Sequence, residues 1–260
     1  MRLWQRTFEI APQGPLAMQA KAGVAGMDIL LGNDEAAHVS IDRLIADFND
    51  HPGLPQTIFR IGEEYYNKAS QMEKEGLKAE SEECFQKAIT VWEKIIPLES
   101  HTIYSPHAWY FSGYAYLKME DYAKAIECCQ KVLSTWPNYQ FAWSAQYMIA
   151  DCARKLGRNG GMPKEESAAL RESGYLGVIN NYAGSPLEKR ALRELAGYYV
   201  EKKQWGQAIE YYNRLLEKDY GYLDKVYSSM LRCYNELGLT EIATELQRVK
   251  QEEAKEEEAN

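Results

Sequence analysis

Apolar residues recur at helical spacing in three similar stretches of the chain. Residues 85–97 read FQKAITVWEKIIP, residues 121–137 read DYAKAIECCQKVLSTWP, and residues 205–216 read WGQAIEYYNRLL. In each stretch an alanine (Ala88, Ala125 or Ala208) is followed by apolar positions that would pack on one side of a helix. The pattern predicts three helices of one type, and therefore an internal repeat.

An adjacent pair of cysteines, Cys128 and Cys129, lies in the second stretch. The equivalent positions of the other two stretches hold apolar or aromatic residues, namely Val91, Trp92, Tyr211 and Tyr212. A disulfide within the pair is unfavourable, because adjacent Cα atoms are about 3.8 Å apart and ordinary bridges need roughly 4.4–6.8 Å. We expect both cysteines to act as small packing residues.

Another helical pattern precedes each stretch and carries a small residue where two helices would cross closely. These small residues are Ala25, Gly62, Gly113 and Ala196. An offset of 12 residues leads from Gly113 to Ala125, and a spacing of 34 residues leads from Gly113 to Tyr147. The same two intervals recur around Ala196, so one register runs along the chain.

This period, and its pattern of aromatic, small and proline positions, resembles the tetratricopeptide repeat. The best copy is residues 106–139, in which Trp109, Gly113, Tyr116, Ala125 and Pro137 occupy signature positions. The resemblance implies an all-α, right-handed superhelical solenoid of about six helix–turn–helix repeats. We place the repeats after a lead-in of residues 1–17 and before an acidic tail of residues 252–260, near residues 18–51, 55–101, 106–139, 140–186, 189–222 and 223–251.

Two of these repeats are longer than the family pattern. From Gly62 to Ala88 is 26 residues, which is 14 more than the usual offset, and from Tyr147 to Arg171 is 24, which is 12 more. The first insertion is charged and rich in helix formers, so we expect both helices of a protruding hairpin to gain about two turns. The second is rich in Gly with a Pro and predicts a loop, with Arg171 in place of a small residue.

Two segments share an order of residue types that resembles one branch of the family. Residues 44–66 and 178–199 share an aromatic residue, a short polar turn with Pro, and a new helix rich in Ala, Gly and Tyr. They resemble bacterial envelope proteins, including the lipoprotein of the outer-membrane β-barrel assembly machine and the Tol–Pal coordinator. That resemblance implies a role in envelope assembly. The compartment stays open: the cytoplasm as the chain stands, or the periplasm if an upstream export signal is missing.

Composition and motifs argue against several kinds of site. A net charge of −8 and a pI near 5.2 disfavour nucleic acid as a partner. No apolar stretch approaches the roughly 18 residues of a membrane span. Motifs for haem, nucleotide phosphates and dinucleotides are absent from the sequence, and His101 and His107 do not have a zinc-site spacing. We therefore expect no cofactor, no metal and no enzymatic activity.

The resemblance also implies a binding surface, because the first helix of each pair lines the concave groove of such arrays. This register places aromatic anchors and flanking arginines in the groove, as peptide recognition requires. The expected groove residues are Phe59, Arg60, Tyr66, His107, Tyr110, Phe111, Tyr114, Phe141, Arg190 and Arg193. The family's carboxylate clamp would need Lys and Asn where Tyr110 and Tyr114 stand, so we do not expect a chaperone-tail adaptor.

The sequence thus favours a non-enzymatic scaffold that binds a protein or peptide segment through the groove. The alternative role for any single aromatic residue in this set is to contact the neighbouring repeat without binding a partner. Two other functions stay open: a module that self-associates into a larger assembly, and an accessory helical region of a longer catalytic polypeptide.

Overall fold

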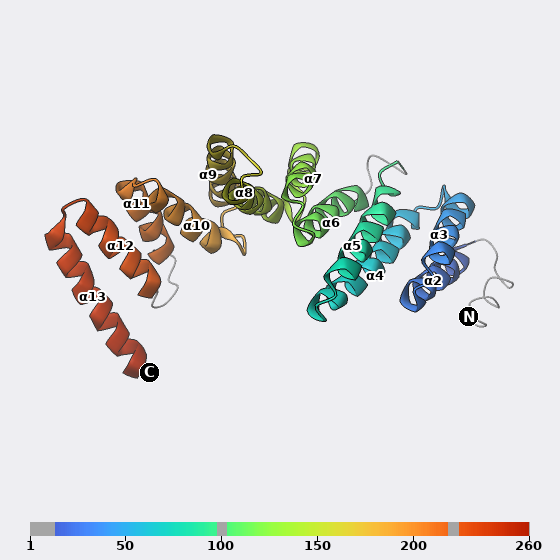
Figure 1. Ribbon diagram of the computed structural model, residues 1–260, viewed down its shortest axis with the longest axis horizontal. Helices are drawn as coiled ribbons and strands as arrows, with labels where there is room; N and C mark the ends of the chain where they lie inside the picture. Colours follow the sequence, from blue (N-terminus) through green and yellow to red (C-terminus); the bar gives the residue numbers. More distant parts are fainter. Residues whose placement is uncertain (1–13, 98–102, 218–223, 260) are drawn as a thin grey trace. The chain divides into compact units, whose positions relative to one another are not determined.

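A computed structural model describes residues 14–97, 103–217 and 224–259, which form two compact units, Met1–Ala142 and Trp143–Asn260. Every regular element in these ranges is an α-helix, and there are twelve (Figure 1). Within each successive pair, such as the helices Leu54–Lys74 and Lys78–Glu93, a short turn joins two antiparallel helices (Figure 1). The all-α expectation is confirmed.

Unit 1 contains three helix pairs, and a continuous apolar core joins its first five helices. The first and third helices each have a proline in the first turn, where the backbone N–H that proline lacks would have no partner within the helix. Asp121 caps the last helix, because its side chain accepts a hydrogen bond from the backbone N–H of Lys124 at 3.2 Å. The helices are α2 (Pro15–Leu31), α3 (Asp34–Phe48), α4 (Leu54–Lys74), α5 (Lys78–Glu93), α6 (Tyr104–Lys118) and α7 (Tyr122–Thr135).

Unit 2 has its own apolar core, which is rich in tyrosine. Its last helix continues to Ala259, through most of the acidic tail. The helices are α8 (Ala142–Asn159), α9 (Lys164–Asn181), α10 (Glu188–Glu201), α11 (Trp205–Leu216), α12 (Asp224–Glu236) and α13 (Thr240–Ala259).

The cysteine pair fills the crossing of α6 and α7, as predicted from the sequence. Cys128 and Cys129 are free thiols that are 5% and 0% exposed. A Cβ added to Gly113 would lie 3.1 Å from Cys128 Cβ and 3.4 Å from Cys129 Sγ. Burial raises the pKa of Cys128 to about 12, so its thiol stays protonated and unreactive near neutral pH.

The first insertion lengthens the α4–α5 hairpin. Residues 73–80 at its tip are all exposed, so it protrudes as expected. The two extra turns are found only in the first helix: α4 has 21 residues against 15 in α6, whereas α5 has 16 against 14 in α7. Helix α5 is shorter than expected because it ends at Glu93, only five residues after Ala88.

The second insertion also lengthens a hairpin, so the predicted loop is wrong. Helix α8 continues to Asn159 and α9 begins at Lys164, which leaves only residues 160–163 as the turn. The expected role of Arg171 is wrong too. The small residue of α9 is Gly174, where an added Cβ would lie 2.7 Å from Ala150 Cβ. Arg171 forms an ion pair with Glu201 instead, at 2.8 Å.

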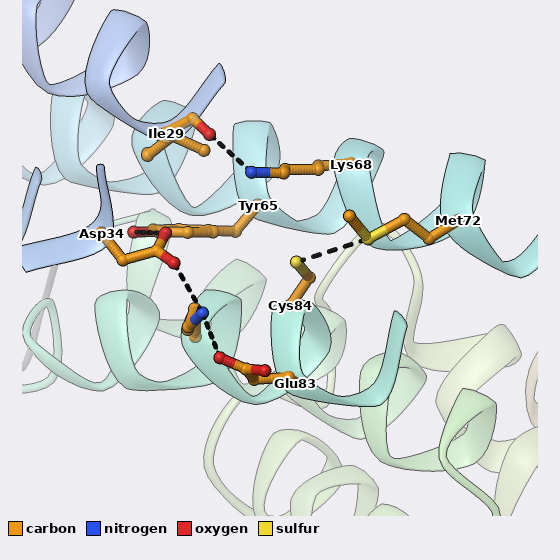
Figure 2. A network of polar contacts seen from close by, with 8 residues as sticks. Ile29, Asp34, Tyr65, Lys68, Met72, Glu83 and Cys84 are labelled. Atoms are coloured by element: carbon orange, nitrogen blue, oxygen red, sulfur yellow. Dashed lines mark hydrogen bonds and ion pairs between the residues drawn. The ribbon is translucent and has the colours of Figure 1, made fainter. Parts of the chain in front are cut away.

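A polar network joins the first helix pair to the middle of the long hairpin (Figure 2). Asp34, in the first turn of α3, accepts from the Tyr65 hydroxyl at 3.1 Å and from Lys87 Nζ at 2.7 Å. Lys68 Nζ donates to the carbonyl of Ile29, near the end of α2, at 2.7 Å. These bonds satisfy helix-end groups and fix where the α2–α3 turn meets α4 and α5.

Candidate functional site

Five of the expected groove residues form one aromatic cluster in unit 1. Phe59 of α4 lies 5.6 Å from His107 and 5.5 Å from Phe111, measured between ring centroids. Tyr110 stacks on Phe141 at 5.3 Å. Phe59 and Tyr110 are only 6% and 7% exposed. These two rings therefore join neighbouring helix pairs, whereas His107, Phe111 and Phe141 are half-buried.

Tyr66 and Tyr114 lie at the edge of this cluster, and both are half-buried. The Tyr114 ring is 6.4 Å from that of Tyr110, and the Tyr66 ring is 5.2 Å from Phe85 and 6.0 Å from Trp92. Burial raises the pKa of Tyr66 to about 12. The Tyr66 phenol therefore stays neutral at physiological pH and offers aromatic surface and a hydroxyl group without charge.

A cavity of about 740 Å³ lies between the first turn of α6 and the segment that follows α7. We call it the aromatic pocket, because three aromatic side chains and one imidazole line it. Its lining residues are Ile103, Tyr104, Pro106, His107, Thr135, Trp136, Pro137, Asn138, Tyr139 and Gln140. Only His107 was expected from the sequence. The Pro-Asn dipeptide after α7 is a turn signal that could have located the rest.

His107 is held in one neutral tautomer. Its Nδ1 lies 2.7 Å from the carbonyl oxygen of Ile103, which can only accept, so Nδ1 carries the proton. Its Nε2 lies 3.1 Å from the side-chain amide nitrogen of Gln140, and therefore accepts. Burial lowers the pKa of His107, although the Ile103 carbonyl opposes this. The imidazole is thus a fixed, uncharged wall of the pocket.

A second hollow, of about 700 Å³, lies between α2 and α4, the first helices of the first two pairs. We call it the α2–α4 groove. Arg60 and Glu64 stand one turn apart on α4, both exposed, and neither forms an ion pair within the described ranges. The lining residues are Pro15, Met18, Gln19, Ala22, Gly23, Gly26, Met27, Leu30, His51, Gly53, Gln56, Thr57, Arg60, Ile61 and Glu64.

The last two expected groove residues, Arg190 and Arg193, belong to unit 2 and lie exposed on α10. The Arg190 guanidinium is 5.2 Å from the centre of the Tyr147 ring, within the range of a cation–π contact. Burial raises the pKa of Tyr212, and the nearby positive charge of Arg193 opposes that rise. They form a separate basic group in unit 2.

Comparison with known proteins agrees with the helix pairs. A family model described as tetratricopeptide repeat matches residues 106–139, which contain α6 and α7. A putative kinesin light chain with nearly identical TPR-like repeats from Podosopora anserina is similar in structure: TM-score 0.54 and 16% identity over 78% of this chain and 99% of that chain. This chain has the tetratricopeptide repeat fold.

A second solved tetratricopeptide-type neighbour is MamA from Desulfovibrio magneticus RS-1, residues 41 to the end. It has a TM-score of 0.50 and 18% identity over 75% of this chain and 96% of that chain. At these identities the two structures show the fold alone. Among curated proteins none matches the chain.

The tetratricopeptide repeat fold is consistent with a scaffold for protein–protein interaction. Within the described ranges, no three His, Cys, Asp or Glu side chains gather as metal ligands would. His101 lies outside those ranges. No helix in the described part of this chain is both long and apolar enough to cross a membrane. The hollows on unit 1 are therefore the features of this tetratricopeptide fold that could receive a partner.

Proposed function

We propose that this protein is a non-enzymatic adaptor that binds a segment of another protein in the α2–α4 groove. The observation that carries the proposal is the groove itself, about 700 Å³ in volume and lined by the first helices of two adjoining repeats. First helices are the ones that line the binding face in the family that the sequence resembles. Arg60, an expected groove residue, stands on its edge.

The chemistry of the groove fits an amphipathic helix. Met27 and Leu30 line it and are 42% and 63% exposed, so a partner would bury apolar surface there. Arg60 and Glu64 can pair with opposite charges on the partner and set its direction. An apolar stripe flanked by charges is the usual ligand of a helix-lined groove.

Charge reversal at Arg60 tests this function. Wild type, Arg60→Glu and Arg43→Glu would each be used to capture partners from native lysate. Arg43 is the matched control, because it is equally exposed but lies on the second helix of the first pair. We expect a partner whose affinity falls at least tenfold with Arg60→Glu and is unchanged with Arg43→Glu.

A partner that binds Arg60→Glu and Leu30→Asp as tightly as wild type would contradict the proposal. The Tyr110→Ala substitution is a poor test, because that ring is buried in the inter-repeat core and its loss would disturb the fold.

Self-association is the second candidate function, and one surface favours it. Leu16 and Leu31 on α2 are 60% and 61% exposed and lie outside the groove lining. A second copy of the chain could bury them, as neighbouring repeats bury each other's faces. Sedimentation over a range of concentrations should then show a dimer that Leu16→Asp/Leu31→Asp converts to monomer. A strict monomer at high concentration would exclude this function.

Bacterial envelope assembly is the proposed setting for either function. It is supported by the style of residues 44–66 and 178–199, which the envelope branch shares. The capture experiment tests this setting. The partner of interest is the one that wild type captures and Arg60→Glu does not, and its compartment decides the question. A periplasmic or envelope partner would support this setting, and a cytoplasmic one would contradict it.

A further inference from the structure

The aromatic pocket has one wall built on a tight turn. Residues 136–139 form this turn, in which the backbone N–H of Tyr139 donates to the carbonyl of Trp136 at 3.0 Å. Pro137 and Asn138 occupy its central positions, where a proline fixes φ and an asparagine is tolerated. The turn therefore holds Trp136 and Tyr139 at its two ends, and both line the pocket.

The opposite wall is the first turn of α6. The Tyr104 ring lies 5.8 Å from His107, and His107 lies 5.1 Å from Tyr139 and nearly perpendicular to it. His107 cannot rotate freely, because both of its ring nitrogens are hydrogen-bonded. The walls are thus rigid, as a preformed site requires.

The described part of the lining carries no charge. None of its ten residues is Asp, Glu, Lys or Arg, and His107 is bonded as the neutral tautomer. A charged group that contacted these residues would lose hydration without gaining a counter-charge. An uncharged occupant therefore suits this part of the pocket.

The pocket also offers a hydrogen-bond donor. The indole ring of half-buried Trp136 lines the cavity, and its N–H group can only donate. A polyproline II segment suits such a wall: its prolines lack N–H groups, its carbonyls are exposed, and its rings pack on aromatic faces. We propose that the aromatic pocket binds an uncharged, proline-rich segment of a partner protein, with Trp136 donating to a prolyl carbonyl.

Titration with a capped decaproline peptide tests this site on the full chain. In nitrogen-15 NMR spectra, the indole resonance of Trp136 should shift on titration while that of Trp109 does not. Trp109 is the matched reference, because it lies on the same helix pair outside the pocket. No shift at millimolar peptide, equal shifts of both resonances, or an equal response to a capped alanine-rich helical peptide would overturn the proposal.

Two variants and one altered probe sharpen the result. Trp136→Phe keeps an apolar ring but removes the donor, and should weaken decaproline binding at least fivefold, whereas Trp109→Phe should not. A peptide with glutamate at alternate positions should bind at least tenfold more weakly than decaproline. Unchanged affinity in either case would contradict the assignment. Arg60→Glu should leave decaproline binding intact, which separates this site from the α2–α4 groove.

Discussion

The two lengthened hairpins, α4–α5 and α8–α9, arise from unlike sequences and have the same construction. The first insertion is rich in charged helix formers, and the second is rich in glycine. In both, a buried serine in the first turn of the second helix donates to a carbonyl of the first: Ser81 to Ala69 at 2.9 Å, and Ser167 to Ala153 at 2.8 Å. The same contact therefore holds the start of the second helix against the first in both hairpins.

The hairpins differ where their helices cross. In α4–α5, Gly62 leaves room for the indole of Trp92, which is fully buried and donates to the carbonyl of Phe59 at 3.1 Å. In α8–α9, Gly174 lies against Ala150, whose Cβ and backbone N would be 2.7 and 3.2 Å from an added Cβ. A glycine thus makes room for an aromatic ring in one hairpin and for a close backbone approach in the other.

Alanine at each glycine should produce the largest effects. In Gly62→Ala the new Cβ would lie 2.2 Å from Trp92 Nε1 and displace the ring, so the hairpin should lose about 3 kcal/mol of stability. Gly174→Ala should cost about 2–3 kcal/mol, because Ala150 Cβ and the Ala150 backbone N, 2.7 and 3.2 Å from the new Cβ, cannot rotate away from it. Hydrogen exchange of each hairpin measures both.

Gly26→Ala is the control for these substitutions. It lies within helix α2, and an added Cβ meets no atom within 4 Å. The change should stabilise the helix by up to about 1 kcal/mol through propensity alone. If Gly62→Ala behaved like Gly26→Ala, the account of the Trp92 crossing would be wrong.

The two serine contacts should be equivalent. Ser81→Ala and Ser167→Ala each remove one buried hydrogen bond, and each should cost about 1 kcal/mol in its own hairpin. Ser134→Ala removes an exposed bond to the carbonyl of Lys131 in the same helix and should change stability by less than about 0.5 kcal/mol. Clearly different stability losses for Ser81→Ala and Ser167→Ala would show that the two contacts are not equivalent.

Tyrosine hydroxyls should have opposite effects in the two hairpins. The hydroxyl of Tyr65 donates to Asp34, whereas the buried hydroxyl of Tyr147 has no partner among the described residues. Tyr65→Phe should therefore destabilise unit 1 by about 1 kcal/mol, and Tyr147→Phe should stabilise unit 2 by up to about 1 kcal/mol. Urea denaturation of both variants checks the sign. A loss of stability in both would show that Tyr147 is satisfied in solution.

Acid should weaken the α4–α5 hairpin through Asp34. Burial raises the pKa of this carboxyl, but hydrogen bonds from Lys87 and Tyr65 outweigh burial, so the pKa lies below its ordinary value of 3.8. Its contribution is complete above pH 3.8 and is lost as pH falls through the lowered value. Hydrogen exchange between pH 4 and 2 should show that the α4–α5 hairpin loses less stability in Asp34→Asn than in wild type. An identical loss in the two proteins would contradict this role of Asp34.

The periodic parts of the chain were predictable, and the parts set by long-range contacts were not. The 34-residue spacing around Gly113 predicts the helix pairs, and packing explains Cys128 and Cys129. Nothing local indicates that Gly157 lies inside α8, where it makes room for Ser167 Oγ at 2.2 Å from an added Cβ. That glycine resembles a helix stop in sequence, and only its neighbour on α9 shows otherwise.

The candidate site divides in the same way. The repeat register selected Arg60, which lines the α2–α4 groove, and His107, which lines the aromatic pocket. The register alone could not show that Phe59 and Tyr110 are buried whereas Arg60 and His107 line hollows. Burial of those two rings by the neighbouring repeat depends on how the rings pack in three dimensions. Trp136 and Tyr139 lie in a turn between helices, which the first-helix rule does not consider.

Site-specific photo-crosslinking tests the central claim, that a protein segment binds in the α2–α4 groove. A photoreactive amino acid would replace Gln56, an exposed residue of the groove lining, and in a matched sample Arg43, before exposure to native lysate and mass spectrometry of the adducts. The account predicts a specific partner peptide crosslinked from position 56 and absent from position 43. The same adducts from both positions, or none from position 56, would contradict it.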